Sequence, residues 1–207
     1  MFVLAGLAWS AAIPRFEGAR FIRANESAAI ATLKNIASGQ RQVQERVQID
    51  RDGDGVGEFG YLAELSGRVA IRGTSRRVDP PVLSRAFGNV SNGCVSRSAY
   101  LFRMYLPGAD GRWLPEADRG GASQRVEPDL AEERWLLYAW PVFLREDTRR
   151  RFVIDQGGDV HAQTAEQVPA EGLVPEPGVT AFCENDGKLE LAHDAPDMLG
   201  DVWVIVQ

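Results

Sequence analysis

The chain has 207 residues, a formal net charge of −6 at pH 7 and a sequence pI near 5.1. Its length suits one domain with an extended segment, and its acidic balance argues against a nucleic-acid partner. Positive charge comes in short runs, Arg76–Arg77 and Arg149–Arg151, which are separated by acidic segments and do not predict a basic face.

An uncharged apolar run, Met1–Ile13, opens the chain and is followed at once by Pro14 and Arg15. This run is too short to cross a bilayer, because a helix needs about 20 apolar residues to span the hydrocarbon core. Three interpretations therefore compete: the core of a signal peptide, a buried core helix, or the end of a spanning helix whose start is missing. A signal peptide normally has basic residues ahead of its apolar run, whereas only Met1 and Phe2 precede Val3 here.

The residues around Pro14 form a distinctive series, in which an apolar helix ends in an Ala-Ile-Pro step and continues into an Ala-rich amphipathic half. Its members are Ala11, Ala12, Ile13, Pro14, Arg15 and Phe16, followed by Arg23, Ala24, Asn25, Glu26, Ala28, Ala29, Ala31, Thr32 and Leu33. This series resembles the N-terminal helix of type IV pilin-like proteins, the family of pilins and type II secretion pseudopilins. Later blocks resemble the heads of such proteins more loosely: GYLAELSG, YLFRMYLP, YAWPVF and FVIDQGGDV.

The resemblance implies a subunit anchored in the bacterial inner membrane, with its head in the periplasm or on an extracellular filament. Such a subunit polymerises through its helix with copies of itself or with related pilin-like subunits. Residues 1–27 would be the anchor and assembly helix, and residues 28–207 a pilin-like head. The chain departs from the family at its start: family precursors carry a basic leader, Gly-Phe and an early glutamate, whereas no acidic residue here precedes Glu17. We therefore expect a missing or trimmed start; the alternative is a subunit that cannot be processed.

An amphipathic stripe continues the helix beyond its apolar part. Apolar residues recur at three- and four-residue steps, with Gln40 completing a series made of Ala29, Leu33, Ile36, Val43 and Val47. One face of this helix is therefore expected to pack on another element of the fold, most simply a sheet. The predicted fold class is α+β, with a long N-terminal helix packed on an antiparallel β-sheet head.

A D-x-D-x-D-G run follows Ile49. Carboxylates at alternate positions with a glycine after the third can surround a hard cation, and calcium is the natural ion for oxygen donors. The predicted ligands are Asp50, Asp52, Asp54, the carbonyl of Val56 and Glu58, with Glu64 as another way to complete the shell. The segment is not an EF-hand, because the twelfth position is Tyr61. The alternative is a solvated Asp/Gly turn, and any calcium would be structural.

The remaining pattern predicts a short helix or turn followed by an antiparallel sheet. Residues 61–67 form the short helix or turn, and residues 68–92 a variable loop. Strands are predicted at residues 98–106 and 135–143, and a hairpin at 151–161 has its turn at Gln156–Asp159. Residues 110–133 are predicted to be a long surface loop. Glu132 and Glu133 are adjacent and would point apart if they lay on a strand, which argues against a catalytic pair of acids.

The C-terminal part, residues 163–207, is predicted to be a β extension of the head, with a turn at Asp186–Gly187 and a last strand at Val202–Val206. If the head is exported, its compartment is oxidising, and Cys94 and Cys183 would then form a disulfide. The alternative is two buried free thiols.

No catalytic motif accompanies these elements: His161 and His193 have no recognisable nucleophile nearby in the sequence, so we expect a protein without enzymatic activity. The predicted function is a structural subunit of a type IV pilus-like or type II secretion pseudopilus-like filament. The alternative is a membrane-anchored, calcium-stabilised binding module outside the cytoplasm. It would recognise a polysaccharide or a protein through residues 110–133, where Trp113 is a candidate contact.

Overall fold

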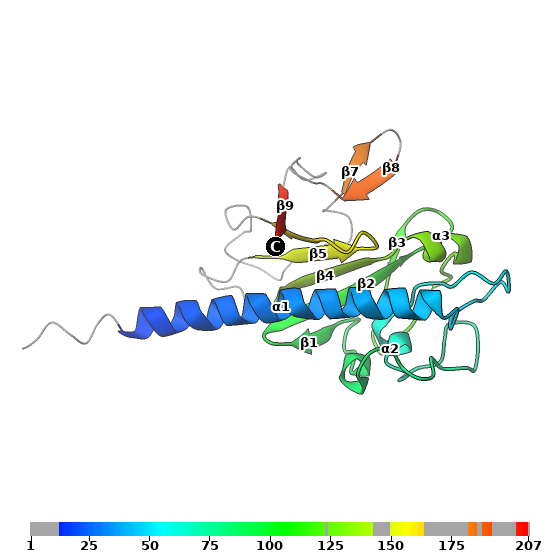
Figure 1. Ribbon diagram of the computed structural model, residues 1–207, viewed down its shortest axis with the longest axis horizontal. Helices are drawn as coiled ribbons and strands as arrows, with labels where there is room; N and C mark the ends of the chain where they lie inside the picture. The colour runs from blue at the N-terminus through cyan, green and yellow to red at the C-terminus, as the bar shows by residue number, and fades with distance from the viewer. Residues whose placement is uncertain are drawn as a thin grey trace, which may run out of the picture.

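The computed structural model (Figure 1) describes residues 13–122, 124–142, 150–163, 182–185, 188–191 and 202–206; residues 13–19, 182–185 and 188–191 are described by their backbone alone. The helices are α1 (Ile13–Glu45), α2 (Leu62–Leu65) and α3 (Pro128–Glu133), with a 3-10 turn η1 (Arg85–Gly88). The strands are β1 (Val95–Arg97), β2 (Tyr100–Pro107), β3 (Trp113–Pro115), β4 (Leu136–Pro141), β5 (Phe152–Asp155), β6 (Val160–Gln163), β7 (Phe182–Asn185), β8 (Lys188–Leu191) and β9 (Trp203–Val206).

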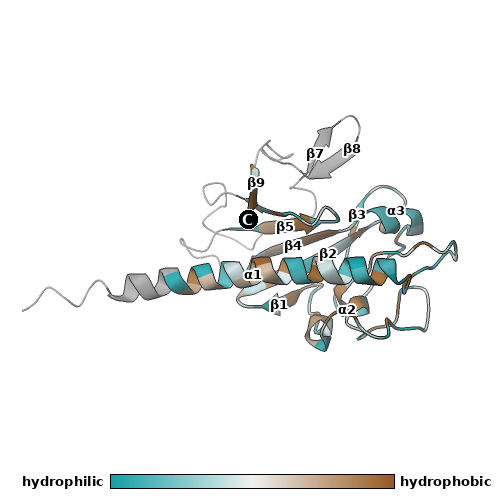
Figure 2. Cartoon of the chain, viewed as in Figure 1, coloured by the Kyte–Doolittle hydropathy of each residue, from teal (hydrophilic) through white to brown (hydrophobic). Residues whose placement is uncertain are grey.

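The fold is α+β, with α1 lying across one face of an antiparallel seven-stranded sheet. The strand order is β1-β2-β4-β5-β6-β9, and β3 pairs with β2. The C-terminal strand β9 joins the main sheet beside β6, whereas β7 and β8 form a separate two-stranded sheet. The central strands are predominantly hydrophobic, and the surface of α1 alternates between hydrophilic and hydrophobic residues (Figure 2).

The main core lies between α1 and the sheet. The helix contributes the predicted stripe residues Ala29, Leu33, Ile36 and Val43, all fully buried. Successive strand residues alternate between the two faces of a sheet. Leu137 and Ala139 of β4 therefore belong to this core, and Tyr138 belongs to a second cluster on the other face with Trp140, Val153 and Trp203.

Gln40 is a polar member of the buried stripe and joins α1 to the chain after the acidic loop. Its Nε2 donates to the carbonyl of Gly60 at 2.8 Å, and the N–H of Gly60 donates to its Oε1 at 2.9 Å. A reciprocal pair of this kind gives both the amide nitrogen and the amide oxygen of Gln40 a hydrogen-bond partner, so the side chain can be buried at little cost in free energy. The predicted stripe extends one step too far, because α1 ends at Glu45 and Val47 lies beyond it with φ of 50° and 38% of its surface exposed.

The strand predicted at residues 98–106 is confirmed with shifted bounds, as β2, and it is the second strand of a hairpin whose first strand, β1, the sequence did not predict. β1 and β2 pair in the register Arg97↔Tyr100, so Ser98 and Ala99 form a two-residue turn with φ of 47° and 63°. Positive φ at both central residues is the geometry of a type I′ turn, which normally selects Asn, Asp or Gly. Ser-Ala carries no such signal, and the sequence therefore predicted neither this turn nor β1. The hairpin predicted at 151–161 is confirmed as β5 and β6.

The long loop predicted at residues 110–133 contains two elements. β3 pairs with the end of β2, and Glu132 and Glu133 lie in α3 rather than on a strand. Pro128 occupies the first turn of α3, where a proline costs no helical hydrogen bond. The predicted strand at 135–143 is confirmed with shorter bounds, as β4.

Candidate functional site

The acidic run after α1 forms a compact loop held by its first aspartate. Asp50 Oδ1 accepts the N–H of Gly53 at 2.7 Å, and Asp50 Oδ2 accepts the N–H of Gly55 at 3.3 Å. Gly53 and Gly55 have φ of 81° and 90°, a conformation that other residues adopt only with strain. The alternating glycines therefore let the chain turn twice around the Asp50 carboxylate.

The other two aspartates of the run cap their own local turns. Asp54 Oδ1 accepts the N–H of Val56 at 2.8 Å, and Asp52 Oδ1 accepts the N–H of Asp54 at 3.4 Å. Carboxylate oxygens of Asp50, Asp52 and Asp54 lie within 4.8 Å of one another. The structure thus brings the three predicted carboxylate ligands of the loop together, and Val56 stays on the same loop with 46% of its surface exposed.

The tertiary structure adds two acids from α3 that the sequence did not predict. Oxygens of Asp129 and Glu132 lie within 4.8 Å of each other and of Asp52. Partial desolvation and the nearby charges of Asp54 and Asp52 raise the pKa of Glu132. The amide of Gln44, on the last turn of α1, donates to the carbonyl of Glu132 and holds α3 beside the loop. We call this group of Asp50, Asp52, Asp54, Asp129 and Glu132 the acidic tip.

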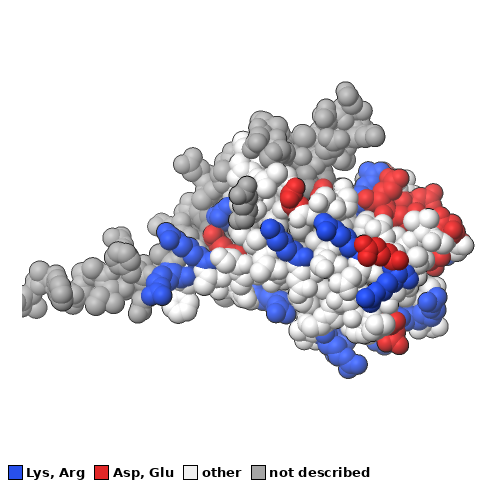
Figure 3. All heavy atoms as spheres, in the orientation of Figure 1, with Lys and Arg blue, Asp and Glu red and all other residues white. Residues whose placement is uncertain are grey.

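The acidic tip lies at one end of the molecule. Acidic side chains gather at the end where α1 stops, whereas basic side chains are spread along the helix (Figure 3). The carboxylates of the tip offer only oxygen donors, which is the ligand type of calcium. No spacing in the sequence links Asp52 to Asp129, because a contact between residues so far apart depends on how α3 packs.

Glu58, predicted as a metal ligand, is engaged elsewhere. Its side chain has no exposed surface, and its Oε2 lies 2.7 Å from Nη2 of Arg72 and 3.0 Å from Nε of Arg51. Its Oε1 accepts the backbone N–H of Arg51 at 2.7 Å. The carboxylate is therefore already bound by two cations and an N–H donor in this structure, and the prediction that it completes the shell of the loop stays a prediction.

Glu64, the other predicted way to complete the shell, is bound in the same buried network. Arg72 Nη1 lies 2.8 Å from its Oε2, and the N–H groups of Arg72 and Tyr61 donate to its two oxygens at 2.7 and 2.9 Å. Arg72 also donates to the carbonyl of Phe59. We call Arg51, Glu58, Glu64 and Arg72 the buried ion network; it fixes the base of the acidic loop against α2.

Glu116 is a third buried carboxyl group, and no cation is paired with it in the described part of the chain. Its Oε1 accepts the N–H groups of Ala63 at 2.9 Å and Gly121 at 3.2 Å, and its Oε2 accepts that of Leu62 at 3.2 Å. Burial raises the pKa of Glu116 to about 8, although the three N–H donors act in the opposite direction. This side chain ties the start of α2 to the turn at Gly121.

The remaining predicted site residues are placed only in part. Cys94 lies just before β1, and Cys183 lies in β7, whose side chains fall outside the described residues, so the disulfide stays a prediction. His161 is buried in β6, and His193 falls outside the described residues. Trp113 is half-buried in β3, beside the second hydrophobic cluster.

Of the predicted anchor, residues 1–27, the first twelve also fall outside the described residues, and the rest belong to α1. Within the part of the chain that is described, no helix has both the length and the apolar composition needed to cross a membrane. Comparisons of the sequence with protein-family models and with curated proteins, and of the fold with solved structures, found no match.

Proposed function

We propose that this protein is a structural subunit of a type IV pilus-like or type II secretion pseudopilus-like filament, assembling through its N-terminal helix with copies of itself or with related pilin-like subunits. The observation that carries the proposal is the contrast between the two halves of α1. One half is packed on the sheet, and the other extends past it (Figure 1). The pilin-like series around Pro14 lies at the start of the extending half.

The packed half of α1 is fixed by its burial. Leu33, Ile36 and Val43 have no exposed surface, and burial of a large aliphatic side chain contributes about 1.5–3 kcal/mol each. An ion pair between Arg150 and Glu26, at 3.4 Å, also joins α1 to the chain just ahead of β5. From Ala29 onward, α1 is therefore part of the head.

The extending half keeps apolar surface in solvent. Phe21 is 70% exposed, although a phenylalanine of a soluble helix normally packs on something. A helix that projects apolar residues away from its own head gains stability by bundling with other helices, at about 25 cal/mol per Å² of apolar surface buried. In such a bundle the heads remain on the outside, which is the arrangement of a filament.

Calcium at the acidic tip would serve this function structurally. The aspartates of the loop converge without a cation among the described residues, and a bound ion would relieve their mutual repulsion. Asp50, Asp52 and Asp54 would hold the ion, with Asp129 and Glu132 of α3 close enough to contribute in place of Glu58. The ion would thereby join the end of α1 to α3.

Two substitutions in α1 test the proposed division of the helix. Phe21→Asp should abolish filaments seen by electron microscopy while leaving the free energy of unfolding of the head within about 0.5 kcal/mol of wild type. Leu33→Ala, its matched control, should lower that free energy by about 3 kcal/mol, because it leaves a cavity between helix and sheet.

Deletion of Met1–Arg23 gives the third arm of the test. The truncated chain should be a folded monomer by circular dichroism and analytical ultracentrifugation, since the buried contacts of α1 begin at Ala29. A truncated chain that still forms fibres, or a wild-type chain that forms none when expressed with a pilus or type II secretion machinery, would contradict the filament function.

A further inference from the structure

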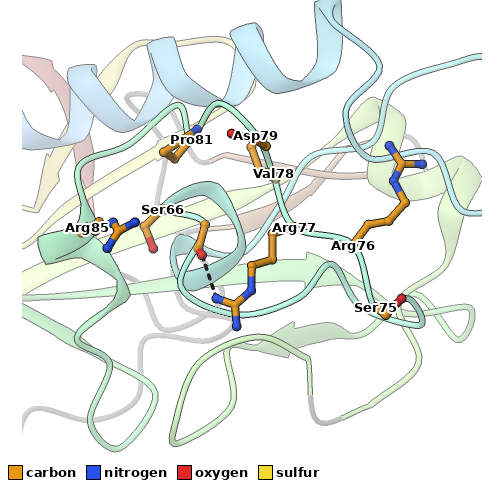
Figure 4. A pocket seen from close by; sticks show the side chains of 9 residues that line it. Ser66, Ser75, Arg76, Arg77, Val78, Asp79, Pro81 and Arg85 are labelled. Atoms are coloured by element: carbon orange, nitrogen blue, oxygen red, sulfur yellow. Dashed lines mark hydrogen bonds between the residues drawn. The ribbon is translucent and has the colours of Figure 1, made fainter.

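An arginine-rich pocket lies on the flank of the head, beside α2. It has a volume of about 560 Å³, and its lining includes Ser66, Ser75, Arg76, Arg77, Asp79 and Arg85. These residues come from the end of α2, the following loop and the start of η1 (Figure 4). We call this cavity the arginine pocket.

The pocket concentrates positive charge in an acidic protein. From Ser66 to Arg103 the chain has seven arginines and a single acid, Asp79, although the whole chain has a net charge of −6. Of the seven, Arg72 is neutralised in the buried ion network. Arg76 and Arg85 both contribute to the lining of the pocket, and their side chains make no hydrogen bond or ion pair within the described residues, so their charge stays unpaired there.

Arg77 is held in position for a ligand. Its Nη1 donates to the carbonyl of Gly67 at 2.9 Å and also to that of Arg68. Figure 4 shows this guanidinium joined by a hydrogen bond to the backbone next to Ser66, whereas the side chain of Arg76 lies on the other side of the loop. A guanidinium fixed by two carbonyls loses little side-chain entropy when its remaining N–H groups bind a carboxylate.

The spread of the arginines favours a partner with several carboxylates over a single small anion. The acidic tip of a second copy has this character: Asp52, Asp54 and Asp129 are exposed, and the segments that carry them, the loop after α1 and the helix α3, lie at one end of the molecule (Figure 1). A convex acidic end and a concave basic flank are complementary in both shape and charge. We propose that the arginine pocket receives the acidic tip of a neighbouring copy of this chain.

The two surfaces occupy different parts of the molecule, with the tip at its end and α2 on its flank (Figure 1). Their pairing is therefore a heterologous contact, which repeats from copy to copy instead of closing into a two-fold dimer. In copies arranged in parallel and staggered along α1, the tip of one meets the flank of the next. The inference rests on the proposed filament function, which supplies the parallel arrangement of the copies. It adds a contact between the globular heads of neighbouring copies.

The test uses the full-length chain, prepared as a mixture of unlabelled and ¹⁵N-labelled protein, with Ser75→p-benzoylphenylalanine as a photoreactive probe in the pocket. Irradiation is done in a chelator, so that the tip keeps its full negative charge, and adducts are mapped by mass spectrometry. The expected product joins residue 75 of one chain to the Asp50–Asp54 loop of the other, in mixed light–heavy pairs. Its yield should fall as the salt concentration rises.

Charge reversal then separates a specific contact from general attraction. Arg76→Glu with Arg85→Glu should lower the adduct yield at least tenfold, since neither side chain holds the fold together. Asp52→Lys with Asp54→Lys, which leaves the turn-forming Asp50 intact, should do the same. All four changes together should restore the yield to within about threefold of wild type. The matched control, Arg112→Glu with Arg119→Glu, makes the same change in net charge outside the pocket and should leave the yield unchanged.

Filaments are counted by electron microscopy in the same samples. Filaments without the mixed adduct would overturn the contact and leave the filament function standing. The mixed adduct in detergent-solubilised protein that never forms filaments would support the contact and contradict the filament function. The variant that combines all four substitutions should restore the adduct. If it does not, although it has the melting temperature of wild type, the contact is also overturned.

Discussion

The acidic tip and the buried ion network contain the same kind of side chain a few residues apart, in opposite surroundings. Asp52 and Asp54 are exposed and are held only by backbone N–H groups, whereas Glu58 and Glu64 have no exposed side-chain surface and share Arg72. A carboxylate in water needs no partner, but a buried one must be paired or neutralised. The comparison shows that the tip is free to bind something else, whereas the network is already complete.

Glu116 shows a second way to bury a carboxyl group. It receives three backbone N–H donors and no cation from the described residues, and burial raises its pKa to about 8. Near neutral pH, therefore, Glu116 largely carries a proton. Three measurements test this contrast between buried and exposed acids.

The largest effect is expected from the centre of the network. Arg72→Met should lower the free energy of unfolding by about 3–5 kcal/mol, because it leaves Glu64 buried without a cation and weakens the pairing of Glu58. Urea unfolding followed by circular dichroism measures the change. Arg76→Met, the control on an exposed arginine nearby in the chain, should stay within about 0.5 kcal/mol of wild type. Equal effects of the two substitutions would contradict the role given to Arg72.

A smaller effect is expected from the titration of Glu116. Its pKa is raised on folding, so the folded state binds the proton more tightly and loses stability as pH rises from the unfolded pKa, about 4.5, through about 8. Between pH 6 and 8 the wild type should lose about 2 kcal/mol more than Glu116→Gln, which has no proton to lose. Parallel stability curves for the two proteins over this range would show that Glu116 is already ionised, held by its three N–H donors.

The smallest effect is expected at the acidic tip. Calcium should raise the melting temperature by a few degrees, since about 1 kcal/mol of binding corresponds to about 2–4 °C in a chain of this size. Asp52→Ala should abolish the increment, because Asp52 belongs to both groups of converging carboxylates. Asp110→Ala, at an exposed acid outside the tip, should preserve it. A calorimetric titration without heat, together with an unchanged melting temperature, would leave only the solvated-turn interpretation.

Local patterns predicted much of the framework correctly. The three- and four-residue spacing from Ala29 to Val43 gave the buried face of α1, and Gln156–Asp159 gave the β5–β6 turn. These features depend on residues close in the chain, whose periodicity or turn chemistry is visible in the sequence. The Ser98–Ala99 turn was missed because its residues are unusual for positive φ, and only pairing between β1 and β2 holds them there.

The candidate site divides in the same way. The Asp50–Asp54 loop could be predicted from local sequence, since alternate aspartates and glycines specify the turn and bring their own carboxylates together. Three other contacts depend on how distant segments pack. Glu58 pairs with Arg72, α3 brings Asp129 and Glu132 to the loop, and Arg85 joins Arg77 at one pocket. The physical reason is burial: which partner a charge takes depends on which distant segments exclude water around it, and spacing along one segment does not contain that information.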